Sequence, residues 1–161
     1  MTDERKGEKR GVYLADAVSA DELLKLDNQL CFALYVCSKE IIRKYKPLLD
    51  PLHLTYTGYI TMMALWEKDE ITVKKLGERL TLDSGTLTPL LKKLEVLSYI
   101  ERVRSGKDER NVYVRLTETG RTLKKEAAHV PEQLICSVQM DAKNAMQLRN
   151  TLHDLIRQLN G

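Results

Sequence analysis

The sequence predicts a mainly α (α+β) fold, and two observations on its apolar residues support that prediction. Over most of the 161 residues, apolar side chains recur every three or four positions, which is the spacing that gives a helix one buried face. The period shortens to two only at Tyr99–Arg104 and Asn111–Leu116, which predicts one short β hairpin. We therefore expect helices on both sides of a single hairpin.

The first part of the chain predicts an arm followed by a long helix. Residues 1–20 are charged and show little periodicity, so we expect a mobile N-terminal arm. Ser19-Ala-Asp-Glu22 has the form of a capping box, and the stripe that follows it predicts a helix ending before Pro47. The members of that stripe are Leu23, Leu26, Leu30, Leu34, Cys37, Ile41 and Tyr45. Thr55 or Thr57 can begin the next helix.

Two short helices joined by a tight turn are predicted next. Thr72 can cap a helix up to Leu80, and Asp83 or Ser84 can cap a second helix that runs to about Leu97. Pro89 lies near the first turn of the second helix, so we expect a slight bend there and no helix end. Because the hairpin follows directly, residues 70–117 describe a winged helix-turn-helix.

The segment after the hairpin is predicted to be helical. Thr117 can cap a helix that runs toward Val130, where Pro131 interrupts it. A final helix carries an apolar stripe at Ala145, Leu148, Leu152, Leu155 and Leu159.

Charge is distributed unevenly along the chain. The net charge is only +3, but residues 70–125 hold 13 basic and 8 acidic side chains, so the predicted winged module is basic. Hydroxyl side chains on its second helix suit base edges or phosphates, and its lysines suit phosphates. These residues are Ser84, Thr86, Thr88, Lys92 and Lys93. At the hairpin tip we expect Asp108 and Arg110 to belong to the DNA-binding surface, and Arg110, at the end of the tip, is placed to enter a minor groove. The alternative is that the hairpin tip and the lysines are only solvated surface.

Several classes of protein are disfavoured by the sequence. No apolar run approaches the roughly 18 residues of a membrane span, and the first ten residues lack the apolar core of a signal peptide, so we expect a cytoplasmic protein with no membrane partner. His53, His129 and His153 form no ligand motif, and we expect no metal and no organic cofactor.

Cys31, Cys37 and Cys136 are an odd set without a C-x-x-C spacing, which leaves room for a working thiol. Cys31 and Cys37 cannot pair within one helix, because six residues rise about 9 Å and a disulfide needs Cα atoms within about 7 Å. Cys37 lies on the apolar stripe, where a small buried hydrophobe is the ordinary interpretation. Cys136 is the thiol available to resolve an oxidised Cys31, although its apolar surroundings also suit a core position.

Several of these segments resemble the organic hydroperoxide regulator branch of the MarR family, over roughly residues 23–160. The segments that carry the resemblance are Leu26–Tyr35, Tyr45–Asp50, Leu54–Tyr56, Leu65–Glu67, Leu82–Pro89 and Asp108–Arg110. Similarity to the MarR family rests on Asp108-Glu-Arg110 after the helix-turn-helix. Similarity to the peroxide-sensing branch rests on Gln29-Leu-Cys31-Phe32 and the tyrosines.

The resemblance implies a homodimeric transcriptional repressor that binds a double-stranded DNA operator and is not an enzyme. Residues 21–161 would form a single domain, in which residues 21–69 and 118–161 supply dimerisation helices and residues 70–117 read DNA. Organic hydroperoxide would oxidise Cys31 to a sulfenic acid, held by Tyr45 and Tyr56 of the other subunit with Tyr35 nearby. Residues 130–136 resemble the segment with the resolving cysteine of two-cysteine members, which implies a Cys31–Cys136 disulfide between subunits.

Two other functions remain open from the sequence. A MarR-type regulator that binds a small phenolic or apolar ligand would make Cys31 incidental. A thiol peroxidase would turn over hydroperoxide, but the chain lacks a T-x-x-C segment and carries a DNA-reading module that such an enzyme does not need.

Overall fold

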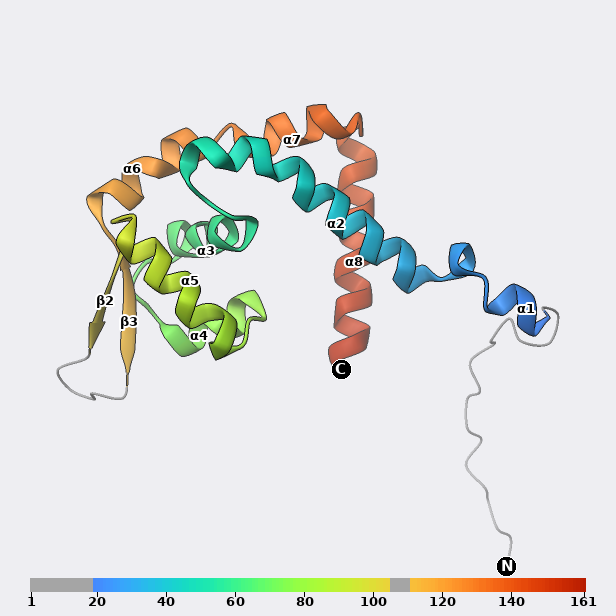
Figure 1. Cartoon of the computed structure of the whole chain (residues 1–161), viewed down its shortest axis with the longest axis horizontal. Coiled ribbons are helices and arrows are strands. Elements are labelled where there is room, and N and C mark those ends of the chain that lie inside the picture. Colours follow the sequence, from blue (N-terminus) through green and yellow to red (C-terminus); the bar gives the residue numbers. More distant parts are fainter. Residues whose placement is uncertain (1–18, 105–110) are drawn as a thin grey trace, which may run out of the picture. The chain divides into compact units, whose positions relative to one another are not determined.

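The computed structural model of the protein describes residues 19–104 and 111–161, so the hairpin tip and all but the last two residues of the arm predicted at residues 1–20 lie outside the described residues. Those last two residues belong to the helical start, because Ser19 caps α1 and Ala20 begins it. The elements follow one another as shown in Figure 1. They are α1 (Ala20–Leu23), the 3-10 turn η2 (Leu26–Asn28), α2 (Leu30–Leu49), the 3-10 turn η3 (Asp50–Leu52), α3 (Tyr56–Glu67), β1 (Ile71–Thr72), α4 (Val73–Leu80), α5 (Ser84–Val96), β2 (Ile100–Arg104), β3 (Val112–Leu116), α6 (Glu118–Ala127), α7 (Val130–Val138) and α8 (Ala142–Asn160). The mainly α fold with one hairpin is confirmed. The chain divides at Ile41–Ile42, within α2, into two compact units that are described separately.

The first unit contains a break that the apolar stripe did not predict. Ser19 caps α1 as expected, but the helix ends at Leu23 and α2 begins at Leu30. Side-chain amides compete with helix continuation here: Asn28 Nδ2 donates to the Glu22 carbonyl at 2.8 Å, and Gln29 Nε2 donates to the carbonyls of Leu23 and Lys25. The single long helix predicted from Leu23 onward was therefore wrong at its start.

The predicted end of that helix before Pro47 was also wrong, because α2 continues through Pro47 to Leu49. A proline inside a helix removes one i→i−4 hydrogen bond and crowds the carbonyl four residues earlier, so continuation past Pro47 must be favoured by other contacts. Leu49 is 1% exposed, so its burial in the core favours continuation of the helix past the proline.

Helix α3 lies at the centre of the second unit. It contacts α4, α5, α6 and β3, and it buries Gly58, Tyr59, Thr61, Met62, Ala64 and Leu65. The core around it combines buried residues from the end of α2, from both helices of the helix-turn-helix and from the hairpin, such as Leu49, Leu76, Leu91 and Val114. The two helices of the helix-turn-helix therefore rest on the same core as the rest of this unit.

Local capping fixes where the helices of this unit begin. Thr55, Thr72, Asp83 and Thr117 each accept a hydrogen bond from a backbone N–H three residues later, at 2.9 to 3.3 Å. All four starts agree with the sequence prediction. Pro89 lies inside α5 without ending it, also as predicted.

The sheet has three antiparallel strands in the order β1-β3-β2. Its hairpin pairs Ile100 with Leu116, Arg102 with Val114 and Arg104 with Val112. The hairpin was predicted to within one residue at each strand. Strand β1 was not predicted, because a two-residue strand has no period of its own and exists only through its pairing with β3.

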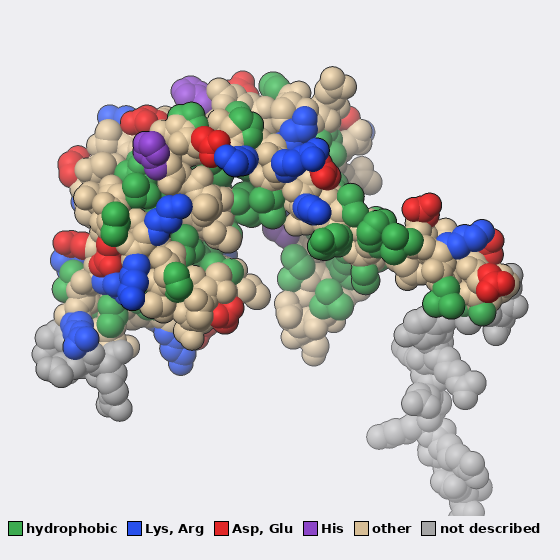
Figure 2. All heavy atoms as spheres, viewed as in Figure 1, with side chains coloured by type: hydrophobic (Ala, Val, Ile, Leu, Met, Phe, Trp, Pro, Cys, Tyr) green, Lys and Arg blue, Asp and Glu red, His purple; other side chains and the backbone are tan. Residues whose placement is uncertain are grey.

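Helix α6 ends at Ala127, and Pro131 is the second residue of the next helix, α7. Helices α7 and α8 carry exposed apolar residues, including Ile135, Val138, Met146, Leu148 and Ile156. Figure 2 shows hydrophobic side chains on the surface of α8 and, in the first unit, along α2. Within the described residues, no helix combines the length and apolar character needed to cross a membrane.

Candidate functional site

The tight turn between α4 and α5 sets the geometry of the candidate DNA-binding surface. Thr81 adopts a left-handed conformation (φ 54°), and the Leu82 N–H donates to the Gly77 carbonyl at 3.0 Å. A Cβ atom at Gly77 would lie 3.0 Å from the Leu82 carbonyl oxygen, so the turn has little room for a side chain there. The chain thus passes from α4 to α5 in only three residues.

One face of α5 is buried and the opposite face is free to meet DNA. Leu87, Leu91 and Leu94 are at most 2% exposed and hold the helix against the core. The predicted DNA-contacting residues of this helix are all exposed. They are Ser84, Thr86, Thr88, Lys92 and Lys93. Asp108 and Arg110, the predicted wing-tip contacts, lie outside the described residues.

Asp83 organises the first turn of α5. The hydroxyl and the backbone N–H of Thr86 both donate to its carboxylate at 2.9 Å, and these bonds lower the pKa of Asp83 below its ordinary value. Asp83 therefore stays ionised at neutral pH. Because the Thr86 hydroxyl proton is engaged with Asp83, a DNA base would compete with the cap for that donor.

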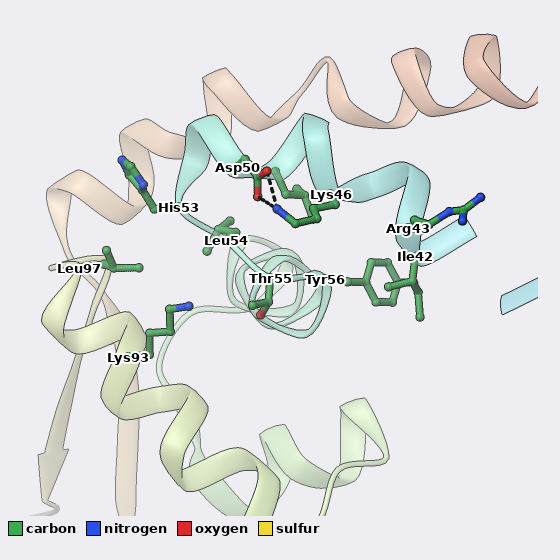
Figure 3. A pocket seen from close by; sticks show the side chains of 11 residues that line it. Ile42, Arg43, Lys46, Asp50, His53, Leu54, Thr55, Tyr56, Lys93 and Leu97 are labelled. Atoms are coloured by element: carbon green, nitrogen blue, oxygen red, sulfur yellow. Dashed lines mark hydrogen bonds and ion pairs between the residues drawn. The ribbon is translucent and has the colours of Figure 1, made fainter. Parts of the chain in front are cut away.

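Lys93 lies beside a pocket of about 730 Å³ between α5 and the connection from α2 to α3. Figure 3 shows Lys93 extending toward Leu54 and Thr55, with Tyr56 at another side of the pocket. The Lys46 ammonium bonds both carboxylate oxygens of Asp50 at the rim, at 2.7 and 3.0 Å. Lys92, one position earlier on α5, does not line this pocket. The sequence treated the two lysines alike, whereas the structure separates them.

Two of the three predicted sensor tyrosines lie together. The rings of Tyr45 and Tyr56 are 4.9 Å apart between centroids, and Tyr59 lies 5.9 Å from Tyr45. Burial, followed by the neighbouring hydroxyls of Tyr56 and Tyr59, raises the pKa of Tyr45 to about 12. Tyr45 therefore keeps its phenolic proton at neutral pH and can donate a hydrogen bond.

Tyr59 and Trp66 extend this aromatic cluster, with ring centroids 6.4 Å apart. Their spacing of seven residues on α3 places them on one face, and that signal was present in the sequence although no site role was given to them. Tyr35 belongs to the first unit and is exposed, with the Lys39 ammonium 6.0 Å from its ring centroid.

All three cysteines are free and exposed. Cys31 lies in the first turn of α2 and Cys136 in α7, so neither is enclosed in a core. The interpretation of Cys37 as a buried hydrophobe was wrong, because the part of α2 before Ile42 has no buried residue. Among residues 19–104 and 111–161, no group of three or more His, Cys, Asp or Glu side chains is placed to hold a metal ion.

Comparison with known sequences places this chain among bacterial transcriptional regulators. Residues 43–127 match the family described as transcriptional regulator SarA/Rot. The chain is 46% identical over 136 residues to the organic hydroperoxide resistance transcriptional regulator of Bacillus subtilis, covering 84% of this chain and 92% of the relative. It is 47% identical over 131 residues to the regulator SarZ of Staphylococcus aureus, covering 81% and 88%.

Solved structures agree with that placement. Reduced AbfR bound to DNA matches with a TM-score of 0.72 and 31% identity, covering 86% of this chain and 95% of AbfR, a protein of Staphylococcus epidermidis. Disulfide-formed AbfR matches with a TM-score of 0.59 and 32% identity, covering 87% and 93%. Because the chain folds as a winged helix-turn-helix and has relatives of this identity and coverage, it belongs to the MarR family of transcriptional regulators, in its organic hydroperoxide resistance regulator branch.

Proposed function

We propose that the protein is a homodimeric repressor that binds operator DNA when reduced and releases it after an organic hydroperoxide oxidises Cys31. The observation that carries this proposal is the free, exposed thiol of Cys31 in a chain that is 46% identical to a regulator named for organic hydroperoxide resistance. A cysteine oxidised by a peroxide must be reachable by it, and exposure meets that condition.

The exposed face of α5 supports the DNA-binding part of the proposal. In a winged helix-turn-helix the second helix enters the major groove, and a two-fold dimer presents two such helices to half-sites about 10 base pairs apart. Ser84 and Thr88 then reach base edges or phosphates, and Lys92 neutralises phosphate. AbfR was solved with DNA both in its reduced and in its overoxidised form.

The redox step needs only the peroxide and two thiols. Cys31 Sγ attacks the outer oxygen of the hydroperoxide, the O–O bond breaks, and the products are a Cys31 sulfenic acid and an alcohol. The Cys136 thiol of the other subunit then attacks the sulfenic sulfur, which forms the disulfide and releases water. Because AbfR was solved with DNA even when overoxidised, we assign DNA release to the disulfide and not to oxidation alone.

The tyrosine cluster supports the sensing part. Tyr45 retains its proton because its pKa is about 12, so it can donate to an oxygen of a sulfenic acid or of a bound peroxide. In the proposed dimer, Tyr45 and Tyr56 of one subunit donate hydrogen bonds to the oxidised Cys31 of the other. A tenfold loss of DNA affinity corresponds to only about 1.4 kcal/mol, well within what one covalent bond between subunits can impose.

The test is operator binding by wild type, Cys31→Ser and Cys136→Ser, each with and without cumene hydroperoxide. We expect oxidant to weaken DNA binding by the wild type at least tenfold and to leave Cys31→Ser unchanged. A non-reducing gel should show a crosslinked dimer for oxidised wild type and none for either variant. Cys37→Ser is the matched control, since Cys37 is a second exposed thiol on the same helix.

Release of DNA by oxidised Cys31→Ser would show that Cys31 is not the sensor. A crosslinked dimer that survives in Cys136→Ser would show that Cys136 does not resolve it. Sustained consumption of hydroperoxide with a thiol reductant, over many turnovers, would favour a thiol peroxidase instead.

The pocket beside α5 favours a second candidate function, regulation by a small ligand. Its lining combines apolar side chains such as Ile42, Leu54 and Leu97 with charged groups at the rim, which suits an apolar molecule carrying a polar group. Weakening of operator binding by a salicylate-like compound, together with no response to hydroperoxide, would favour this function over cysteine sensing.

A further inference from the structure

Glu95, in the last turns of α5, joins the DNA-reading helix to the hairpin through both of its carboxylate oxygens. Oε1 accepts the backbone N–H of Arg102 at 3.1 Å. Oε2 accepts Arg102 Nε at 2.8 Å and Nη2 at 2.6 Å. A single carboxylate therefore holds both the backbone and the side chain of one residue on β2.

This pair is more enclosed than an ordinary surface ion pair. The Arg102 and Glu95 side chains are 28% and 29% exposed, whereas the pair between Arg79 and Glu67 is 63% and 61% exposed. A planar guanidinium that offers two donors to one carboxylate oxygen, next to a backbone N–H on the other oxygen, fixes orientation as well as distance.

The position of Arg102 makes the bond a link between two DNA-facing elements. β2 is an edge strand, and Arg102 pairs across the hairpin with Val114, which is fully buried. The connection from α5 to β2 spans only residues 97–99 and includes Ser98 in a left-handed conformation (φ 58°). The Arg102 side chain also lines a cleft with Lys74 of α4 and Thr88 of α5.

The sign of the charge argues for a positioning role. Residues 70–125 carry an excess of basic groups, and a carboxylate on the reading helix opposes the approach of DNA phosphates. Glu101, next to Arg102 on β2, is exposed and points to the opposite face of the strand, so it offers a carboxylate of the same charge without the link.

We propose that Glu95 is a positioning residue that fixes the β2–β3 hairpin against α5 through Arg102 and thereby raises operator affinity without contacting DNA. The proposal rests on operator binding by the winged module and adds to it a determinant outside the DNA-facing side chains. Its effect runs against simple electrostatics, because removing this negative charge weakens binding.

The test compares Glu95→Gln with Glu101→Gln, two variants with the same change of charge and shape. We expect Glu95→Gln to lower operator affinity on the order of tenfold. We expect Glu101→Gln to bind as the wild type does, or slightly tighter. Measuring operator affinity at several salt concentrations separates a displaced hairpin from a partly unfolded protein. A displaced hairpin loses phosphate contacts, so the slope of log affinity against log salt concentration falls in magnitude by about one. Partial unfolding lowers the amount of active protein and leaves that slope unchanged.

A double-mutant cycle with Arg102→Gln tests whether Glu95 acts through Arg102. We expect the loss caused by Glu95→Gln to be smaller in the Arg102→Gln background, because only the bond to the backbone N–H of residue 102 is then left to lose. In the free protein, the Arg102 backbone amide should exchange faster in Glu95→Gln than in wild type or Glu101→Gln, because its acceptor is weakened.

Wild-type affinity in Glu95→Gln, or an equal loss from Glu95→Gln with and without Arg102, would overturn the proposal. Failure of the wild type itself to bind operator would contradict the proposed function instead. In that case unchanged exchange at Arg102 would still reject the link, and faster exchange would support it.

Discussion

Gly120 packs so closely against the backbone of Tyr99, in the connection from α5 to β2, that a side chain at its position would overlap that backbone. A Cβ atom there would lie 2.0 Å from the Tyr99 carbonyl oxygen, while the Gly120 carbonyl accepts Trp66 Nε1 at 2.9 Å. We expect Gly120→Ala to lower the free energy of unfolding by about 1–3 kcal/mol, because backbone must move to admit the methyl group. Urea denaturation measures this loss. Thr119→Ala, an exposed neighbour on α6, is the control and should leave the denaturation midpoint nearly unchanged; an equal midpoint for both variants would contradict the close packing.

Residue roles that depend on neighbours along the chain could be predicted, and roles that depend on distant neighbours could not. Thr72, Asp83 and Thr117 were assigned as caps because a cap needs only the next three residues. Cys37 was assigned to a core because it lies on an apolar stripe, but Cys37 is exposed. An apolar stripe indicates that a helix face is buried against something, and it does not indicate that the same chain buries it. The Glu95–Arg102 link has a separation of seven residues across a turn and carries no periodic signal.

Asp69, just after the end of α3, joins that helix to strand β3 and to helix α6. Its carboxylate accepts the backbone N–H of Leu116 at the end of β3 and that of Glu70, and it pairs with Arg121 of α6 at 2.8 Å. Burial raises the pKa of Asp69, but the two backbone N–H groups and the Arg121 guanidinium outweigh it, so the pKa lies below the ordinary value.

We therefore expect Asp69→Asn to lower the free energy of unfolding at pH 7 by about 1–3 kcal/mol. A depressed carboxyl pKa gives stability that is present above the unfolded-state value and lost as the pH falls through the folded-state value. The gap between wild type and Asp69→Asn should consequently close as the pH is lowered below about 4. Urea denaturation at several pH values measures the gap. Asp27→Asn, at an exposed position, is the control, and a gap that stays constant down to pH 2 would refute the ionic role of Asp69.

Elements with their own period and caps were predictable, and interruptions of a period were not. The four capped helix starts and the hairpin followed from local sequence. The break between α1 and α2 depends on Asn28 and Gln29 side chains that bond backwards to carbonyls, which an apolar stripe cannot reveal. Strand β1 depends on β3, more than forty residues later.

At the scale of the whole molecule, exposed apolar residues gather outside the winged module. They occur on α1 and α2 in the first unit and on α7 and α8 in the second, whereas the described residues of the winged module include few large apolar side chains that are exposed, namely Val96, Val103 and Tyr113. Large apolar patches on a monomer mark interaction surfaces, and a helix-turn-helix regulator needs a two-fold partner to span two half-sites. A second copy of this chain meets both needs.

We therefore expect the protein to sediment at twice the mass of one chain, and a charge on α8 to dissociate it. Ile156 is 52% exposed, and Ile156→Glu should shift the protein toward monomer, because a buried unpaired carboxylate opposes association. Operator affinity should fall with it on the order of a hundredfold or more, since each monomer engages only one half-site. Val96→Glu is the control for mass, because Val96 is 84% exposed on the winged module and should leave the dimer intact. A wild type that sediments as a monomer would contradict the dimer itself. An Ile156→Glu variant that dimerises as the wild type does would remove α8 from the interface and leave another part of the chain to join the two subunits.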